Sequence, residues 1–228
     1  MKKFVQVLCV SAALTTMAAA ADVQKLDNRV AAAHAVLHQL MLTPDKGIPE
    51  GIAQKATCVA VIPGLKKGAF GIGGQYGQGV VSCRTGHGWS APAFIQITGA
   101  SFGFQIGAQS TDLVLIATNH DGFQHLLKDK VKLGADAAVA AGPVGRTSDA
   151  STTELANAAF LSYSRSKGIF AGVDLSGDVV NQNQDDTKAY YGKDVPFQTI
   201  LSGGVSTPLG AKHFVATVSQ LFRVSRAR

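Results

Sequence analysis

Hydrophobic side chains recur at steps of three and four along the first part of the chain. From Val23 to Met41 the apolar positions form one stripe, which is typical of one face of an α-helix. Asp22 precedes the stripe as an N-cap candidate, and residues 43–47 break the pattern. A second, short helix is expected to begin at Pro49, because proline suits the first helical turn.

The period changes to two after this point. Residues 58–62 are apolar throughout and are followed by Pro63-Gly64, so we predict a buried strand that ends there. Between residues 68 and 81 apolar side chains alternate with glycine, which indicates a strand that bends or lies close to another backbone. Further strands are predicted over residues 101–109, 112–117 and 169–176.

Short helices are expected between and after these strands. Their patterns cover residues 121–127, 185–191, 195–202 and 208–222. Together the patterns predict an α+β fold, with a glycine-rich, mostly antiparallel sheet, an amphipathic N-terminal helix and short peripheral helices. Since no stretch has the composition of a linker, residues 22–228 are expected to form a single domain.

The first residues have the three-part pattern of a secretory signal peptide. Lys2 and Lys3 give a positive start, residues 4–14 are largely apolar, and the alanines at 18–21 offer a cleavage site. The apolar stretch is short for a membrane span, although an uncleaved anchor is the alternative. We therefore expect residues 1–21 to be a signal peptide, and the mature protein to be periplasmic or secreted, with peripheral contact to a membrane.

The charge pattern excludes some function classes. Only 16% of the residues are charged, which argues against a disordered chain. The net charge is +6, but the basic residues are scattered along the sequence, whereas proteins that bind nucleic acids cluster them. No nucleic-acid partner is expected.

Two cysteines remain after signal-peptide cleavage, Cys58 and Cys83. An oxidising compartment would allow them to form a disulfide, and two buried thiols in neighbouring strands are the alternative. His34 and His38 lie four apart on the predicted first helix, a spacing that can hold a metal ion. No carboxylate or cysteine nearby in the sequence completes such a site, so no metal and no other cofactor is expected.

One motif resembles a catalytic signature. Residues 99–103 match G-x-S-x-G, the nucleophile elbow of α/β-hydrolases. That elbow requires a strand, a sharp turn and a helix, whereas the residues after Ser101 keep the alternation of a strand. A serine hydrolase at Ser101 is the less favoured alternative, and no catalytic residue is assigned.

Basic residues near predicted turns offer the remaining candidate chemistry. If these turns gathered at one end of the sheet, they would form a shallow cationic rim for phosphate head groups; otherwise each is an ordinary solvated charge. The N-terminal helix could also lie on a bilayer, but it has few cations and no Trp or Phe, so packing on the sheet is expected. The candidate lipid-binding residues are Lys66, Lys67, Arg84, Arg146, Arg165 and Lys167.

Several motifs taken together carry a family resemblance. They lie at residues 48–50, 55–64, 67–80, 89–94, 98–114, 133–137, 141–146, 163–173 and 190–192. With these motifs the chain resembles the SYLF domain, also called the Ysc84 actin-binding domain, over roughly residues 25–205.

The resemblance implies a lipid-binding module and no enzyme. Eukaryotic members of the family bind phosphoinositides, and some bind actin. The signal peptide indicates a bacterial protein, which removes actin as a native partner and leaves anionic phospholipid at a membrane surface of the cell envelope as the expected partner. A structural or protein-interaction role in the envelope is the alternative. The resemblance also gives Ser101 a place in a family signature, which is another explanation for that serine.

Overall fold

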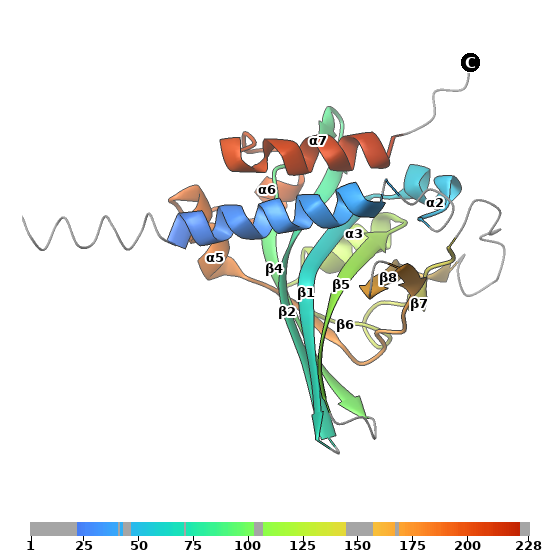
Figure 1. Ribbon diagram of the computed structural model, residues 1–228. Helices are drawn as coiled ribbons and strands as arrows, with labels where there is room; N and C mark the ends of the chain where they lie inside the picture. The colour runs from blue at the N-terminus through green and yellow to red at the C-terminus, as the bar shows by residue number, and fades with distance from the viewer. Residues whose placement is uncertain are drawn as a thin grey trace, which may run out of the picture.

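A curled, mostly antiparallel sheet with helices packed on it organises the protein (Figure 1). The computed structural model describes residues 22–40, 42, 47–70, 72–102, 107–144, 157–166 and 169–223, so the predicted signal peptide lies outside the described residues. The α+β fold class is confirmed. Among the helices described, none is long and apolar enough to cross a bilayer.

The structure contains the predicted helices and also strands that the sequence patterns did not predict, at residues 88–89, 93–100, 130–132, 139–141, 160–166 and 179–182. The strands are β1 (Cys58–Phe70), β2 (Ile72–Thr85), β3 (Gly88–Trp89), β4 (Ala93–Phe102), β5 (Gly107–Ala117), β6 (Lys130–Lys132), β7 (Val139–Ala141), β8 (Phe160–Ser166), β9 (Ile169–Gly172) and β10 (Val179–Gln182). The helices are the N-terminal helix, which includes residues 22–40, and α2 (Glu50–Lys55), α3 (His120–Leu126), α5 (Gln184–Tyr191), α6 (Phe197–Leu201) and α7 (Lys212–Leu221), with a 3-10 turn at Leu209–Ala211.

Neighbouring strands in the sheet run in the order β6–β10–β4–β2–β1–β5–β8–β7. β3 pairs with β2 and β9 pairs with β8. Among the strand pairs described, β7–β8 is parallel and the others are antiparallel. The four longest strands, β1, β2, β4 and β5, therefore lie side by side in the middle of the sheet.

The first predicted strand is longer than expected. Pro63-Gly64 does not end it: the register shifts between Ile62 and Leu65, and β1 then continues to Phe70. Gly64 has a φ of +61°, and its N–H donates to the Asp112 carboxylate at 3.0 Å. A bulge with glycine in the left-handed region lets the strand bend and resume.

Three other strand predictions are wrong in their extent. Residues 68–81 do not form one strand, because β1 ends at Phe70 and β2 begins at Ile72 and pairs antiparallel with it. Residues 101–109 do not form one strand, because Ser101 lies on β4 and Ala108 on β5, and β2 and β1 lie between these strands. The strand predicted over 169–176 ends at Gly172. In each case the alternation of residue types continues past the point where the chain leaves the strand, so the pattern alone does not mark the strand end.

The N-terminal helix packs on the sheet, as predicted. Its Arg29 forms an ion pair with Asp186 of α5 and donates to the Gln78 side chain of β2 at 2.9 Å. Tyr190 of α5 donates its hydroxyl to Asp27 at 3.0 Å. The apolar stripe is buried against the sheet together with α7; its buried members are Leu26, Val30, Ala33, Val36, Leu37 and Leu40.

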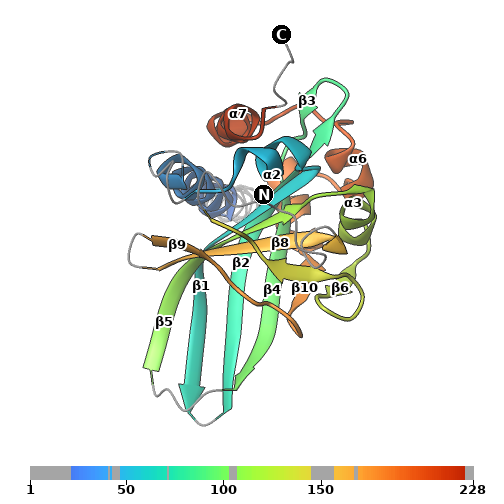
Figure 2. The same cartoon turned by 90° about the vertical axis from the view of Figure 1, so that its right-hand side faces the viewer.

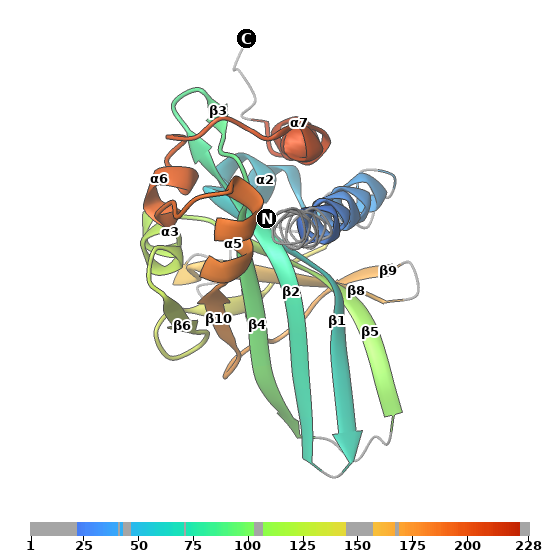
Figure 3. The ribbon, with the colours of Figure 1, turned by 90° about the vertical axis from the view of Figure 1, so that its left-hand side faces the viewer.

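Beyond the helices the four long strands continue to a free end, and we call this part the tongue. It consists of residues 66–70, 72–78, 96–102 and 107–111. Figures 2 and 3 show from two sides that the tongue runs past the helices and the shorter strands. At the other end of the sheet, Cys58 and Cys83 face each other across β1 and β2 and are joined in a disulfide, with their Cα atoms 3.9 Å apart.

Candidate lipid-binding surface

The tongue has two faces, which the alternation of side chains along β2 distinguishes. Val80 packs in the core under the N-terminal helix, and Gln78 accepts a hydrogen bond from Arg29 of that helix. Alternate residues of a strand share a face, so Tyr76 and Gly74 lie on the same side as Val80 and Gln78. We call this the outer face, and the opposite side the inner face.

A polar row crosses the outer face of the tongue where the helices no longer cover it. In register, Tyr76 of β2 stands between Thr98 of β4 and Lys66 of β1, and Lys66 stands beside Ser110 of β5. Lys66 and Ser110 are exposed, and Tyr76 is 45% exposed. This hydroxyl–lysine row (Thr98, Tyr76, Lys66 and Ser110) presents one ammonium group and three hydroxyl groups on a single face, all of them able to donate to a phosphate oxygen.

Arg165 lies on the same face, one strand farther along the sheet. It stands opposite Asp112 in the β5–β8 register and forms an ion pair with it, 3.3 Å from Nη1 to Oδ2. Asp112 follows Ser110 by two residues, so it lies on the helix side of the row. The structure therefore brings Lys66 and Arg165 onto one face, with the Arg165 charge balanced by Asp112.

Lys67 points to the inner face, because it is the next residue of the strand after Lys66. It stands opposite Gln75, whose amide donates to the buried carboxylate of Asp178. Burial raises the pKa of Asp178, and the positive charge of Lys67 acts in the opposite direction. Lys67 thus balances an internal carboxylate and does not extend the row that contains Lys66.

Arg84 lies near the disulfide end of β2 and does not gather with Lys66. Its guanidinium donates to the carbonyls of Ala56 at 3.0 Å and Phe222 at 2.7 Å, and it stacks 4.8 Å from the ring centroid of Trp89. From Arg84 to Tyr76, the partner of Lys66, β2 extends over about 26 Å. Arg84 therefore does not join the cations at the tongue. Its guanidinium N–H groups instead link β2 to the chain around α2 and α7. Arg146 and Lys167 lie outside the described residues.

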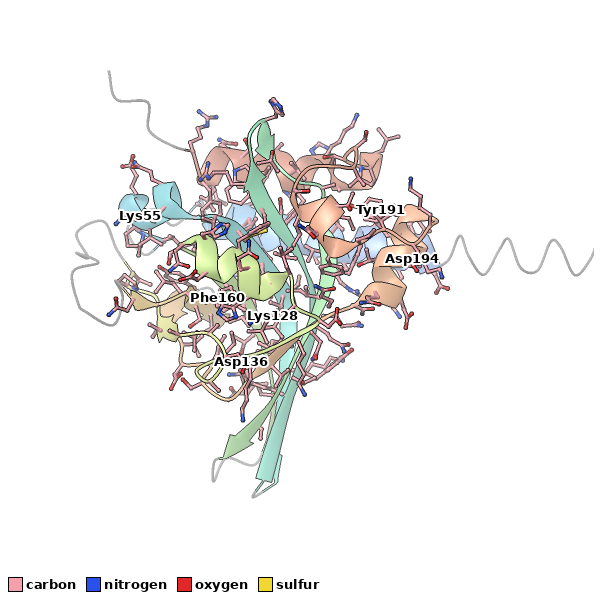
Figure 4. The ribbon with its side chains drawn as sticks, turned by 180° about the vertical axis from the view of Figure 1, so that it is seen from behind. Lys55, Lys128, Asp136, Phe160, Tyr191 and Asp194 are labelled. Atoms are coloured by element: carbon pink, nitrogen blue, oxygen red, sulfur yellow. A yellow bond between two sulfur atoms is a disulfide. The ribbon has the colours of Figure 1, made fainter. Side chains whose placement is uncertain are left out.

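A second group of lysines lies on and just before the edge strand β6, where acidic residues also occur. Lys128, Lys130 and Lys132 are exposed, but Asp129 and Asp136 are interleaved with them, and the Lys132 N–H donates to the Asp136 carboxylate at 2.7 Å. Figure 4 marks Lys128 and Asp136 in this part of the molecule. Lysines on an edge strand discourage pairing with other chains, which explains them without a ligand.

The described residues give little support to catalysis or metal binding. Ser101 lies within β4, opposite Gly73, so it has neither the turn nor the helix of a nucleophile elbow. His34, His38 and His213 lie near each other, with ring centroids 6.0 Å apart for His34 to each of the others. No group of three His, Cys, Asp or Glu side chains among the described residues has the geometry of a metal site.

Comparison with known proteins identifies the family. A family model described as "Ysc84: Las17-binding protein actin regulator" matches residues 98–221, more than half of the chain. The chain belongs to the Ysc84 family. The resemblance to the SYLF domain is therefore confirmed, and the matched segment runs from Thr98 of the hydroxyl–lysine row into α7.

Curated relatives agree with this assignment. LAS seventeen-binding protein 3 of Saccharomyces cerevisiae is 35% identical over 188 residues, which cover 81% of this chain and 39% of the relative. SH3 domain-containing YSC84-like protein 1 of Homo sapiens is 34% identical over 171 residues, 74% of this chain and 50% of the relative. The chain thus spans half or less of the length of these relatives. The name of the yeast relative and the family description denote a binding protein and an actin regulator, and none of these names denotes an enzyme.

The absence of acidic residues from one stretch of the sequence points to this surface, which hydrophobic periodicity and motifs do not reveal. Between Glu50 and Asp112 the chain contains no acidic residue, and this stretch supplies β1 to β4. Counting acidic residues by predicted strand would have singled out the centre of the sheet. The hydroxyl–lysine row itself could not be found in this way, because it depends on the register of four strands.

Proposed function

We propose that this protein binds anionic phospholipid, or a lipid with a phosphoinositide-type head group, through the outer face of its tongue. The protein would act as a non-catalytic module of the bacterial cell envelope. The hydroxyl–lysine row is the observation that carries this proposal: Lys66 is exposed between hydroxyl groups, and no acidic residue lies between Lys66 and Asp112 in the chain. Phosphate oxygens accept hydrogen bonds from both kinds of donor, and the bond from an ammonium group is strengthened by charge.

The expected affinity is modest. Each Lys or Arg near an anionic surface contributes about 1 kcal/mol at physiological salt. A surface with Lys66, part of the charge of Arg165 and the predicted contributions of Arg146 and Lys167 would bind reversibly and in a salt-dependent way. This is the behaviour of a protein that associates with a membrane peripherally.

We propose a periplasmic or secreted location for the mature protein. The signal-peptide pattern at residues 1–21 and the buried disulfide between Cys58 and Cys83 both support export, since disulfides persist in oxidising compartments. N-terminal sequencing of the protein from an envelope fraction tests this: a mature chain beginning at Ala21 or Asp22 is expected, and an intact Met1 would contradict it.

Co-sedimentation with vesicles tests the lipid-binding proposal. The wild-type protein should sediment with phosphatidylcholine vesicles that contain phosphatidylglycerol, much less with phosphatidylcholine alone, and progressively less as salt rises. Lys66→Glu should weaken binding roughly thirtyfold, because it removes one favourable charge and adds an unfavourable one, about 2 kcal/mol in total. Lys212→Glu is the matched control, since Lys212 is exposed on α7 and the change in net charge is the same.

Two results would contradict the proposal. If the two variants weaken binding equally, the outer face of the tongue has no special role. If the wild-type protein binds neutral and anionic vesicles alike at all salt concentrations, head-group charge is not recognised.

A second candidate function is protein interaction in the envelope. Among the described residues, β4 beyond Thr98 and β5 before Asp112 have a ladder partner on one side only, so two strand edges of the tongue are open. Open edges can accept an added strand from another protein. Capture of one envelope protein at the tongue, without any binding to vesicles, would favour this function over lipid binding.

A further inference from the structure

Three histidines meet where the N-terminal helix and α7 lie side by side (Figures 1 and 2). His34 and His38 belong to the N-terminal helix and His213 to α7, and the ring centroid of His34 is 6.0 Å from each of the other two. Nδ1 of His34 is 3.0 Å from the hydroxyl oxygen of Thr217, a buried residue of α7. We call these four residues the histidine seam.

Below the histidine seam the two helices bury apolar side chains in one core cluster. Leu37 of the N-terminal helix and Phe214 and Val218 of α7 are fully buried there. Within the described residues α7 is the last element of the chain. Its departure would therefore uncover this core without removing a strand from the sheet.

We propose that the histidine seam is a pH-sensitive contact, which holds α7 on the N-terminal helix at neutral pH and releases it when the imidazoles are protonated. The inference does not depend on lipid binding, since it concerns a change within the helical layer. Its consequence is an apolar surface that the protein exposes only at acidic pH.

Protonation would place two or three positive charges at the seam. At the effective dielectric constant near a protein surface, the repulsion between two unit charges is about four times stronger than in bulk water. The hydrogen bond to Thr217 can persist, because a hydroxyl group donates to a neutral ring nitrogen and accepts from a protonated one. The added charge opposes docking of α7, and the hydrogen bond does not offset it.

The environment of His34 gives the direction of the effect. Burial lowers the pKa of His34, and the positive charges of His38 and His213 lower it further. The docked state thus binds fewer protons than the released state, so docking is strongest above the ordinary pKa of 6.5 and weakens as the pH falls below it. For each proton taken up on release, the docking equilibrium constant should fall about tenfold per pH unit in this range.

Acidic groups on the elements around the seam have other partners. Asp27 lies two turns before His34 on the N-terminal helix and accepts a hydrogen bond from Tyr190 of α5. Asp186 of α5 is paired with Arg29. On α2 the carboxylate of Glu50 is exposed and accepts a hydrogen bond from its own helix, from the Gln54 amide.

Basic groups around the seam do not compensate for the added charge either. Lys212 directly precedes His213 on α7 and is exposed, so its charge adds to that of the protonated rings. Lys25 on the N-terminal helix and Lys55 on α2 are exposed as well. Protonation therefore turns the seam into a group of like charges.

The single tryptophan of the wild-type chain reports on the position of α7. Trp89 is 9% exposed, and its ring centroid lies 5.8 Å from that of Phe222, which directly follows α7. As the pH falls from about 7.5 to about 5, where histidine takes up its proton, the emission of Trp89 should shift to longer wavelength and its quenching by acrylamide should rise. Far-UV circular dichroism should show that the sheet stays folded over the same range.

Substitutions connect this response to the seam. His34→Gln and His213→Gln should each weaken it, because glutamine stays neutral. His87→Gln is the matched control: His87 is exposed two residues before Trp89, so this variant reveals any direct effect of a nearby imidazole on the emission. It should keep the wild-type response. Melting temperatures at neutral pH show whether each variant is folded, and His213 is exposed, so its substitution leaves the core intact.

The outcomes decide the matter. A response that is reduced in at least one seam variant and kept in His87→Gln supports the inference. A response that is absent from the wild type, unchanged in both seam variants or lost in His87→Gln overturns it. Loss of the circular dichroism signal together with the change in emission also overturns it, since the whole domain would then unfold.

Discussion

Gly99 occupies a position on the inner face of the tongue where a side chain has no room. A Cβ atom there would overlap Oδ1 of Asp178, would lie 2.7 Å from its carboxylate carbon, and would approach the Gln75 amide to 3.0 Å. The carboxylate and the amide are held together by a hydrogen bond, so neither can move without breaking it. The requirement for glycine is therefore steric: it comes from Asp178, which directly precedes β10, the strand that pairs with β4.

Gly99→Ala should lower the free energy of unfolding by about 2 kcal/mol, because it disrupts a buried hydrogen-bonded network. Urea denaturation measures this directly. Gly86→Ala is the control, since a Cβ at Gly86 meets nothing within 4 Å, and it should change stability by less than about 0.5 kcal/mol. Equal effects of the two substitutions would show that the close approach of Asp178 to Gly99 does not affect the free energy of unfolding.

Asp178 predicts a particular pH dependence. Burial raises its pKa, so the folded protein holds the proton more tightly than the unfolded chain does. Its contribution to stability is therefore complete below the ordinary pKa of 3.8 and is lost as the pH rises through the folded-state pKa.

Comparison with a variant isolates this contribution from those of other groups. The difference in unfolding free energy between the wild type and Asp178→Asn should shift in favour of the wild type as the pH falls from 7 toward 4, because only the wild type takes up the proton. Asp194→Asn, at an 85% exposed side chain, should show a much smaller shift. A difference for Asp178→Asn that does not change with pH would contradict this assignment.

At the residue scale, the sequence identified the basic residues but could not tell which of them lie on the outer face of the tongue and which have partners elsewhere. Lys66 and Lys67 are adjacent in the chain, yet they lie on opposite faces of β1, and one of them balances Asp178. Arg84 has the same chemistry as Arg165, yet its donors are taken by carbonyls near α2 and α7. These differences depend on contacts between residues far apart in the sequence, which periodicity does not reveal.

At the scale of elements, the disulfide is the strongest constraint on the β1–β2 pair. It closes a segment with a sequence separation of 25 between Cys58 and Cys83. The chain-entropy estimate for a loop of that size is about 3 kcal/mol, gained because the unfolded chain loses freedom.

Cys58→Ala together with Cys83→Ala should therefore lower the free energy of unfolding by about 3 kcal/mol without changing the fold. Denaturation of the wild type with and without reductant should give the same difference. The intact mass of the unreduced protein provides the control, since the disulfide makes it two hydrogens lighter. Unfolding curves that coincide in the presence and absence of reductant would contradict a structural role for the bond.

Helices were predicted more accurately from the sequence than strand ends. The apolar stripe of the N-terminal helix and the acidic first turn of α5 are local features, and both helices form where these features predict. The limits of β1 and β4 were wrong because the deciding features are not local: a bulge at Gly64 lets β1 continue, and the order of the strands places β4 and β5 apart.

At the scale of the whole molecule, the sheet is divided between two tasks. Near the disulfide end, the N-terminal helix and α7 cover one face and bury it, which stabilises the fold. The tongue extends beyond them with glycine at many positions and with the hydroxyl–lysine row. Among the described residues, its edges on β4 and β5 have a ladder partner on one side only. The sequence predicted the glycine-rich sheet, but only the three-dimensional arrangement shows which part of it the helices leave uncovered.

Under the proposed function, the tongue is the surface that meets the membrane. Hydrogen–deuterium exchange of the wild-type protein, with and without vesicles containing phosphatidylglycerol, tests it most directly. Among the described residues, the amides of 99–102 and 107–111 lie on strands with a ladder partner on one side only, so many of them are open to exchange in the free protein. We predict that vesicles slow exchange in peptides from the tongue and leave α5 and α7 unchanged. Protection of the N-terminal helix or α7, with the tongue unaffected, would contradict this claim.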